Sequence, residues 1–142
     1  MRCSKCKIVV VIMCILLLLM LASCDSQKKY EYYSNTDHYT AVSGTISYIN
    51  LSDDEKTLYV AIDNMSIQLS DNCFKIIEEN LRIIQNQLNV DEIQIGDQVT
   101  LITAPRIFGD GYIMPAVSIA IEGHELLRFE DGVNNLLSWL DA

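Results

Sequence analysis

The sequence predicts a mainly β domain with one or two helices (α+β), built as a small five-stranded barrel with a helix between strands three and four and a short C-terminal helix. Three observations support this fold class. Short strand-like segments separated by turn residues lie between residues 42 and 69, an apolar stripe of helical period follows over residues 71–88, and two further apolar strand segments come after it. About a hundred residues are available for this part, enough for one domain with one core.

Three strands are predicted before the helix. The first runs to about residue 49 and is indicated by alternation of Val42, Gly44, Ile46 and Tyr48. Turn-forming residues at 52–56 lead into a second strand at residues 57–62, so the two form a hairpin. Another turn at residues 63–64 precedes a short third strand at residues 66–69.

One amphipathic helix is predicted over residues 71–88, with Ser70 placed to cap its first turn. Its apolar residues recur at steps of three and four, which places them on one face of a helix. The stripe consists of Phe74, Ile77, Leu81, Ile84 and Leu88, widened by Ile76 and Ile83. We expect this face to be buried in the core.

Two strands and a second helix complete the predicted domain. A turn at residues 93–97 leads into a fourth strand at residues 98–103, and a fifth strand runs over residues 112–121. After a tight turn at residues 122–125, a short helix whose apolar side should cover the core is indicated by Val133, Leu136, Leu137, Trp139 and Leu140.

The order of these elements resembles the OB fold, in which a helix between strands three and four plugs a five-stranded barrel. The resemblance covers residues 40–121 and depends on element order, not on a motif. An open meandering sheet packed on one helix is the alternative. Neither arrangement determines function by itself.

The N-terminal segment resembles the leader of bacterial lipoproteins. Three cations, Arg2, Lys5 and Lys7, precede an apolar run over residues 8–22, and the sequence Leu-Ala-Ser-Cys ending at Cys24 matches the lipobox at all four positions. The resemblance implies that the Cys24 thiol forms a thioether with diacylglycerol, that the chain is cut before this residue, and that the new amino group can be acylated. Two or three acyl chains anchor a protein firmly, because each buried methylene contributes ~0.8 kcal/mol.

Two alternatives to this leader remain. The first is an uncleaved transmembrane helix, although the fifteen residues of the run are fewer than the ~20 that a span needs. The second is an ordinary secretory peptide cut near Ala22, which leaves Cys24 unexplained.

The leader divides the chain into a signal peptide (residues 1–23), a lipid-anchored tether (24–38) and an OB-like domain with its C-terminal helix (39–142). The tether has no apolar periodicity and should hold the domain off the membrane. Lys28 and Lys29 either contact anionic headgroups or are simply solvated. Three tether tyrosines either rest at headgroup level or pack on the domain: Tyr30, Tyr32 and Tyr33.

A second resemblance concerns residues 96–112 and 136–140, which look like parts of small uncharacterised lipoproteins and membrane proteins of clostridial-type Gram-positive bacteria. It implies a location on the extracytoplasmic face of the cell membrane and no particular activity.

Composition argues against several classes of function. After Cys24 the chain has seven Lys and Arg residues against nineteen Asp and Glu residues, a net charge of −12, which disfavours nucleic acid. We expect no enzyme, cofactor or metal site, because His38 and His124 have no spaced partner for metal binding and no evident nucleophile. Cys73, the one cysteine of the domain, is expected to be a small buried residue at the start of the helix.

The candidate ligand-binding loop spans residues 104–112, the connection between the last two strands and a usual contact loop of OB folds. Pro105, Gly109 and Gly111 shape its backbone. Its candidate side chains are Arg106, Phe108, Asp110 and Tyr112, which can stack on a sugar or peptide and form hydrogen bonds with it. In the alternative, the glycines only make the turn while the aromatic residues pack on the barrel.

The sequence therefore predicts a membrane-anchored, non-catalytic binding module for an envelope ligand or a partner protein. The alternative is a structural accessory subunit of a membrane complex, which would use its sheet edge or the C-terminal helix around Trp139.

Overall fold

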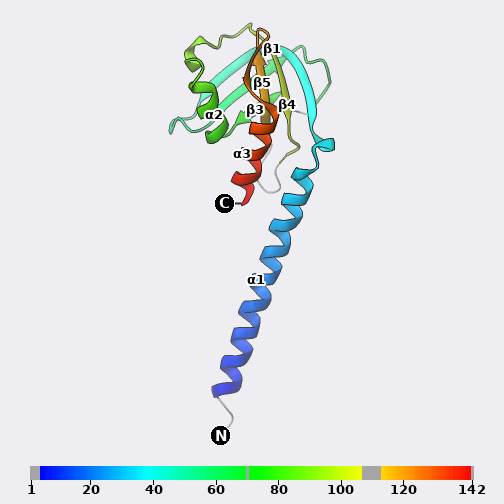
Figure 1. Cartoon of the computed structure of the whole chain (residues 1–142), viewed down its shortest axis with the longest axis vertical. Coiled ribbons are helices and arrows are strands. Elements are labelled where there is room, and N and C mark those ends of the chain that lie inside the picture. Colours follow the sequence, from blue (N-terminus) through cyan, green and yellow to red (C-terminus); the bar gives the residue numbers. More distant parts are fainter. Residues whose placement is uncertain (1–3, 70, 107–112, 142) are drawn as a thin grey trace.

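A computed structural model describes residues 4–69, 71–106 and 113–141, with only the backbone described for residues 22–26. A long helix, α1 (Ser4–Ser34), leads through a 3₁₀ turn (Thr36–His38) into a barrel, and a last helix, α3 (Phe129–Asp141), packs beside the upper end of α1 (Figure 1).

The barrel has five strands and one additional strand. Its sheet order is β3-β2-β1-β4-β5-β6, and pairing of β3 with β5 closes it. The strands are β1 (Thr40–Leu51), β2 (Leu58–Asp63), β3 (Cys73–Ile76), β4 (Gln98–Thr103), β5 (Met114–Ile121) and β6 (His124–Leu127). This topology, with α2 (Glu78–Gln85) between β3 and β4, confirms the predicted OB-like barrel.

Strand β1 belongs to both sides of the barrel. Its first half pairs with β4 and its second half with β2, and the register shifts between Ile46 and Tyr48. A side chain at Gly44 would collide with Ile62 and the Asp63 carbonyl, so only glycine lets the strands approach at this bend. Among the described residues, two parallel pairs close the barrel, Phe74 with Met114 and Lys75 with Pro115, which we call the closing seam.

The third strand and the helix differ from the prediction. Residues 66–69 form no strand, whereas residues 73–76, which were assigned to the helix, form β3. Phe74 and Ile76 are buried while Cys73 and Lys75 are half-buried, which is the two-residue period of a strand. Helix α2 begins only at Glu78, after Ile77 in the cap position; the predicted cap, Ser70, lies outside the described residues.

The other strands lie within two residues of their predicted ends, and the predicted C-terminal helix is present. Strand β6 was not predicted. It follows the tight turn at Glu122 and Gly123, both with positive φ, and pairs with β5. A second 3₁₀ turn, Val90–Glu92, lies between α2 and β4.

The described residues form two apolar cores. The first fills the barrel with side chains from all six strands, and Leu81 and Ile84 of α2 cover it. The second lies outside the barrel, between α3, the end of α1 and the outer side of β5. We call it the outer core; its buried members are Tyr33, Ile77, Ala104, Val117, Val133 and Leu136.

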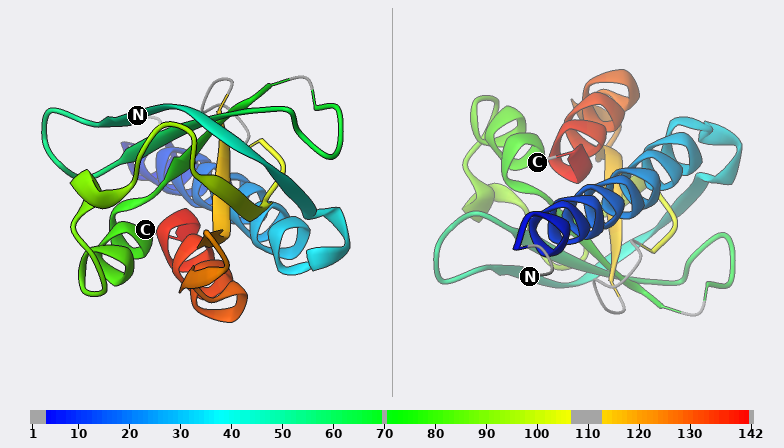
Figure 2. Two further views of the ribbon diagram at one scale, coloured as in Figure 1. Left: turned by 90° about the horizontal axis from the view of Figure 1, so that it is seen from above. Right: turned by 90° about the horizontal axis from the view of Figure 1, so that it is seen from below.

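The outer core decides where the tether tyrosines lie. Tyr33 is completely buried in it, Tyr32 is half-buried and stacked on His38, and Tyr30 is exposed. The polar segment after Cys24 continues α1 as a helix up to Ser34 and packs on the domain. Figure 2 shows the same adjacency of α1 and α3 from above and below.

The first part of α1 is a separate feature. Ser4–Leu21 has a mean hydropathy of 2.5 over 18 residues and is apolar and long enough to cross a membrane. The large apolar side chains of residues 8–21 are all at least half exposed in this structure. An apolar segment of this kind is typical of a signal sequence or a membrane anchor.

Candidate functional site

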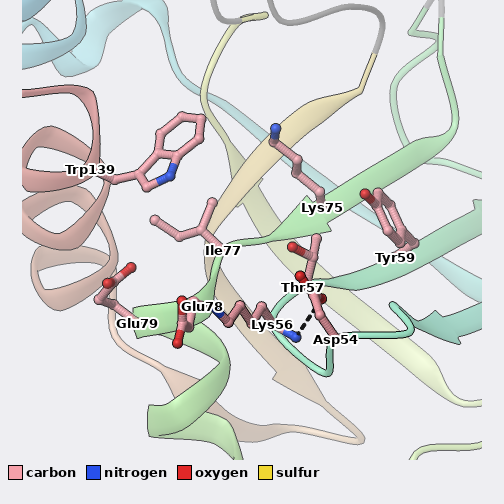
Figure 3. A pocket seen from close by; sticks show the side chains of 9 residues that line it. All are labelled: Asp54, Lys56, Thr57, Tyr59, Lys75, Ile77, Glu78, Glu79 and Trp139. Atoms are coloured by element: carbon pink, nitrogen blue, oxygen red, sulfur yellow. Dashed lines mark hydrogen bonds between the residues drawn. The ribbon is translucent and has the colours of Figure 1, made fainter. Parts of the chain in front are cut away.

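A groove of about 240 Å³ lies on the outer face of β2 and β3 (Figure 3). The β1–β2 turn, the start of α2 and the end of α3 form its other sides. It is lined by Asp54, Lys56, Thr57, Tyr59, Lys75, Ile77, Glu78, Glu79 and Trp139.

Strand register explains why Tyr59 and Lys75 face this groove. The two residues are directly paired between β2 and β3 and therefore lie side by side on one face of the sheet. Their neighbours along the strands, Leu58 and Phe74, point into the barrel and are completely buried. The alternation that builds the core thus places an aromatic ring and an ammonium group on the outside.

The β1–β2 turn is tightly ordered by its own side chains. The Ser52 hydroxyl donates a hydrogen bond of 2.6 Å to the Asp54 carboxylate, and the Lys56 amide donates one of 3.1 Å to the same oxygen. The Thr57 amide in turn donates to the Ser52 hydroxyl at 3.0 Å. The bond from Ser52, with that from the Lys56 amide, holds the pKa of Asp54 below its ordinary value, so this carboxylate is charged at neutral pH.

Trp139 and Lys75 form the aromatic end of the groove. The Lys75 ammonium lies 5.0 Å from the centre of the Trp139 ring, within the range of a cation–π interaction. Figure 3 shows the two side chains turned toward each other above Ile77. Trp139 remains 37% exposed, so a ligand can reach its ring.

The groove has charges of both signs. Glu78 is paired with Arg82 at 2.5 Å along α2, whereas Glu79 is exposed at the rim. The lining can therefore stack on a ring or an apolar side chain and can hydrogen-bond to polar groups around it. In the parts of the chain that the structure describes, no group of three His, Cys, Asp or Glu side chains could hold a metal ion.

Arg106, predicted as a ligand contact, is engaged within the chain. Its guanidinium pairs with Asp71, which lies just before β3, and its backbone carbonyl accepts a hydrogen bond from the Tyr33 hydroxyl. The other loop candidates, Phe108, Asp110 and Tyr112, lie outside the described residues, as do the two loop glycines. The Cys24 backbone is part of α1, and its side chain is not described.

Cys73 lies on β3 and not at a helix start, contrary to the prediction. It is a free, half-buried thiol on the outer face, where burial raises its pKa.

Sequence reasoning named Trp139 but missed Tyr59 and Lys75. A strand assigned to residues 73–76 and paired with β2 would have revealed both residues, because Lys75 then falls opposite Tyr59.

Together, these elements define a small OB-like barrel joined to an apolar N-terminal helix, with one aromatic groove on its β2–β3 face. No protein-family model, curated protein or solved structure matches this chain.

Proposed function

We propose that this protein is a lipid-anchored lipoprotein on the extracytoplasmic face of the cell membrane, and that its barrel is a non-catalytic binding module for an envelope ligand or a partner protein. The observation that carries the proposal is the groove with its exposed Trp139 next to Lys75. OB folds bind ligands with the face of strands two and three and the turn between strands one and two, which are the elements that line this groove.

The apolar segment Ser4–Leu21 and the lipobox ending at Cys24 support the anchoring. Cells grown with labelled fatty acid should incorporate the label into the wild-type protein and not into the Cys24→Ala variant. Cys14→Ala, which changes another cysteine of α1, is the matched control and should stay labelled. An unlabelled wild-type protein, or a mature chain that keeps Met1 in mass spectrometry, would contradict lipidation.

Trp139 also supplies the assay for binding, because it is the single tryptophan of the chain. Its fluorescence should change when envelope fractions that contain the ligand are titrated into the protein, since the ring lines the groove. Lys75→Ala and Tyr59→Ala should weaken the response. Ile95→Ala, which alters an exposed apolar residue away from the groove lining, should leave it unchanged. If Lys75→Ala and Tyr59→Ala give the same fluorescence response as Ile95→Ala and the wild type, the groove is not the binding site.

The accessory-subunit alternative is favoured by the same tryptophan, because α3 carries it on an exposed side. In that case Trp139→Ala should prevent the protein from capturing its partner complex, whereas Tyr59→Ala and Lys75→Ala should leave capture unchanged. Dependence on all three residues would instead favour the binding module.

A further inference from the structure

We infer that the end of α1 is a rigid stalk docked on the domain, which holds the groove close to the bilayer, and that the partner in the groove is a protein embedded in the same membrane. The stalk comprises residues 24–34, which are helical and continuous with the apolar segment. This inference rests on the proposed membrane anchoring.

Tyr33 fixes the stalk to the domain. It is completely buried in the outer core, where it packs with residues of α3 and β5 such as Leu136 and Val117. Its hydroxyl donates to the carbonyl of Arg106, which follows β4, and its own carbonyl accepts a bond of 2.8 Å from the Tyr39 hydroxyl. A flexible linker would make none of these contacts, so the anchor and the barrel move as one body.

The stalk is short. An α-helix rises ~1.5 Å per residue, so Tyr33 lies roughly 18 Å along the axis from Leu21 at the end of the apolar segment, and about 14 Å from Cys24. The polar layer of a bilayer occupies on the order of 5–8 Å on each side of the hydrocarbon. A lipid on Cys24 and a membrane-spanning α1 therefore both place the barrel just above the headgroups.

The groove lies at the membrane-facing end of the domain. Helix α3 runs back toward the side from which α1 descends, and its C-terminus lies on that side of the barrel (Figure 1). Trp139 belongs to the last turn of α3 and lines the groove. A partner must therefore reach the groove from close to the bilayer.

Charge favours a protein over the lipid surface as the partner. The chain after Cys24 has a net charge of −12, which anionic headgroups repel. The groove joins the aromatic ring of Trp139 to polar side chains at Asp54, Lys56, Lys75 and Glu79, and protein interfaces likewise combine aromatic residues with a polar rim.

The stalk can be tested by electron spin resonance on the full-length chain in lipid nanodiscs. Spin-labelled unnatural amino acids at Gln27 in the stalk and Asp53 in the β1–β2 turn, both exposed, leave the native cysteines in place. One narrow distance distribution is expected, which broadens in Tyr33→Ala and stays narrow in Tyr30→Ala. Tyr30 is the matched control because it is 46% exposed on the same helix. A broad distribution in the wild type, or equal widths in the two variants, overturns the rigid stalk.

Folding of the variants is checked separately. Tyr33 is not part of the barrel core, so circular dichroism of Tyr33→Ala should retain the β spectrum of the barrel. Tyr33→Phe removes only the hydroxyl and should broaden the distribution less than Tyr33→Ala. If Tyr33→Ala fails to fold, the wild-type protein still decides, because a narrow wild-type distribution supports docking and a broad one contradicts it.

The partner is tested by a photo-cross-linking amino acid at Lys56, on the rim of the groove, in intact membranes. The expected product contains an integral membrane protein that resists carbonate extraction. Capture should disappear in Tyr33→Ala and persist in Tyr30→Ala. A soluble protein, a wall polymer or no product overturns the assignment of a membrane-embedded partner, while the distance measurement decides the stalk independently. Loss of capture in Trp139→Ala with a narrow distance distribution supports the groove and the stalk together.

Discussion

Tyr39 lies where the stalk, β1 and α3 meet, and its environment makes the domain sensitive to alkali. Its ring contacts Phe129 edge-on at 6.0 Å, and its hydroxyl donates to the Tyr33 carbonyl. Burial, with a smaller effect of Tyr33, raises the pKa of Tyr39 to about 12 from an ordinary value of 10.0. The folded state therefore keeps a proton that the unfolded chain loses first.

The sign of the resulting pH dependence follows from this raised pKa. The stability that Tyr39 contributes is complete below pH 10 and is lost as the pH rises through 10 toward about 12. Denaturant unfolding should show that the free energy of unfolding of the wild type falls as the pH rises across this range. In Tyr39→Phe this fall should be smaller. Tyr48→Phe, at an exposed site on β1, is the control and should keep the wild-type slope. Equal slopes in the two variants would show that Tyr39 is not protected in the folded state.

Individual residues of the groove were predictable only where local pattern decides their position. The apolar period of residues 133–140 placed Trp139 on the last helix, and α3 carries it there. Lys75 of the groove, and Arg106 outside it, were different, because their partners Trp139 and Asp71 come from distant parts of the chain. Likewise, the three tether tyrosines look alike in sequence, and only the phase of α1 against α3 buries Tyr33 and exposes Tyr30.

Two overlapping periodicities explain the wrong boundary between β3 and α2. Phe74, Ile77, Leu81 and Ile84 fit a helical stripe, but Phe74 and Ile76 also fit the two-residue period of a strand. Pairing with β2 on one side and β5 on the other gives residues 73–76 the strand conformation. That pairing is a tertiary interaction, which local propensity does not contain.

Helix α2 offers a direct test of how firmly it covers the barrel. Leu81 is 1% exposed in the barrel core, so Leu81→Ala should lower the free energy of unfolding by about 2–5 kcal/mol through lost burial and a residual cavity. Gln85, one turn later on the exposed side, is the control. Its replacement by alanine should change stability by less than roughly 0.5 kcal/mol. Equal effects in a urea titration would show that α2 does not pack on the sheet.

Helix α3 approaches β5 so closely that only glycine fits at residue 132. A side chain there would collide with the backbone carbonyl of Val117, which cannot move aside as a flexible side chain could. Gly132→Ala gains about 1 kcal/mol of helix propensity, but overpacking at such a contact costs about 1–3 kcal/mol or more. We therefore expect net destabilisation in thermal unfolding, while Asn134→Ala, exposed on the same helix, should be neutral or mildly stabilising. A Gly132→Ala variant more stable than the wild type would contradict this packing.

At the scale of the whole molecule, the barrel could be predicted and the docking of α1 could not. The order of strands and helix is local information, and with the OB-like topology it places β1 between β2 and β4. The outer core contains residues from three separate regions, around Tyr33, Ala104 and Leu136. No sequence pattern in one of these regions indicates that it contacts the other two. The sequence therefore left open whether the tether tyrosines pack on the domain, and the structure places Tyr33 in the outer core.

The strand pairings differ in how far apart they lie along the chain, and this sets an order in which the barrel can fold. The β1–β2, β4–β5 and β5–β6 pairs join consecutive strands, whereas the β1–β4 pair joins Thr40 to Thr103 and the closing seam joins Phe74 to Met114. Contacts of large sequence separation carry a greater cost in chain entropy and form late. We therefore expect pulse-labelled amide exchange to protect the second half of β1, which pairs with β2, before its first half, which pairs with β4, and earlier protection of residues 40–44 than of residues 48–51 would contradict this order. The groove brings Lys75 of β3 together with Trp139 of α3, two residues far apart in the sequence, so a partly folded chain without such late contacts would have no groove with which to hold a partner.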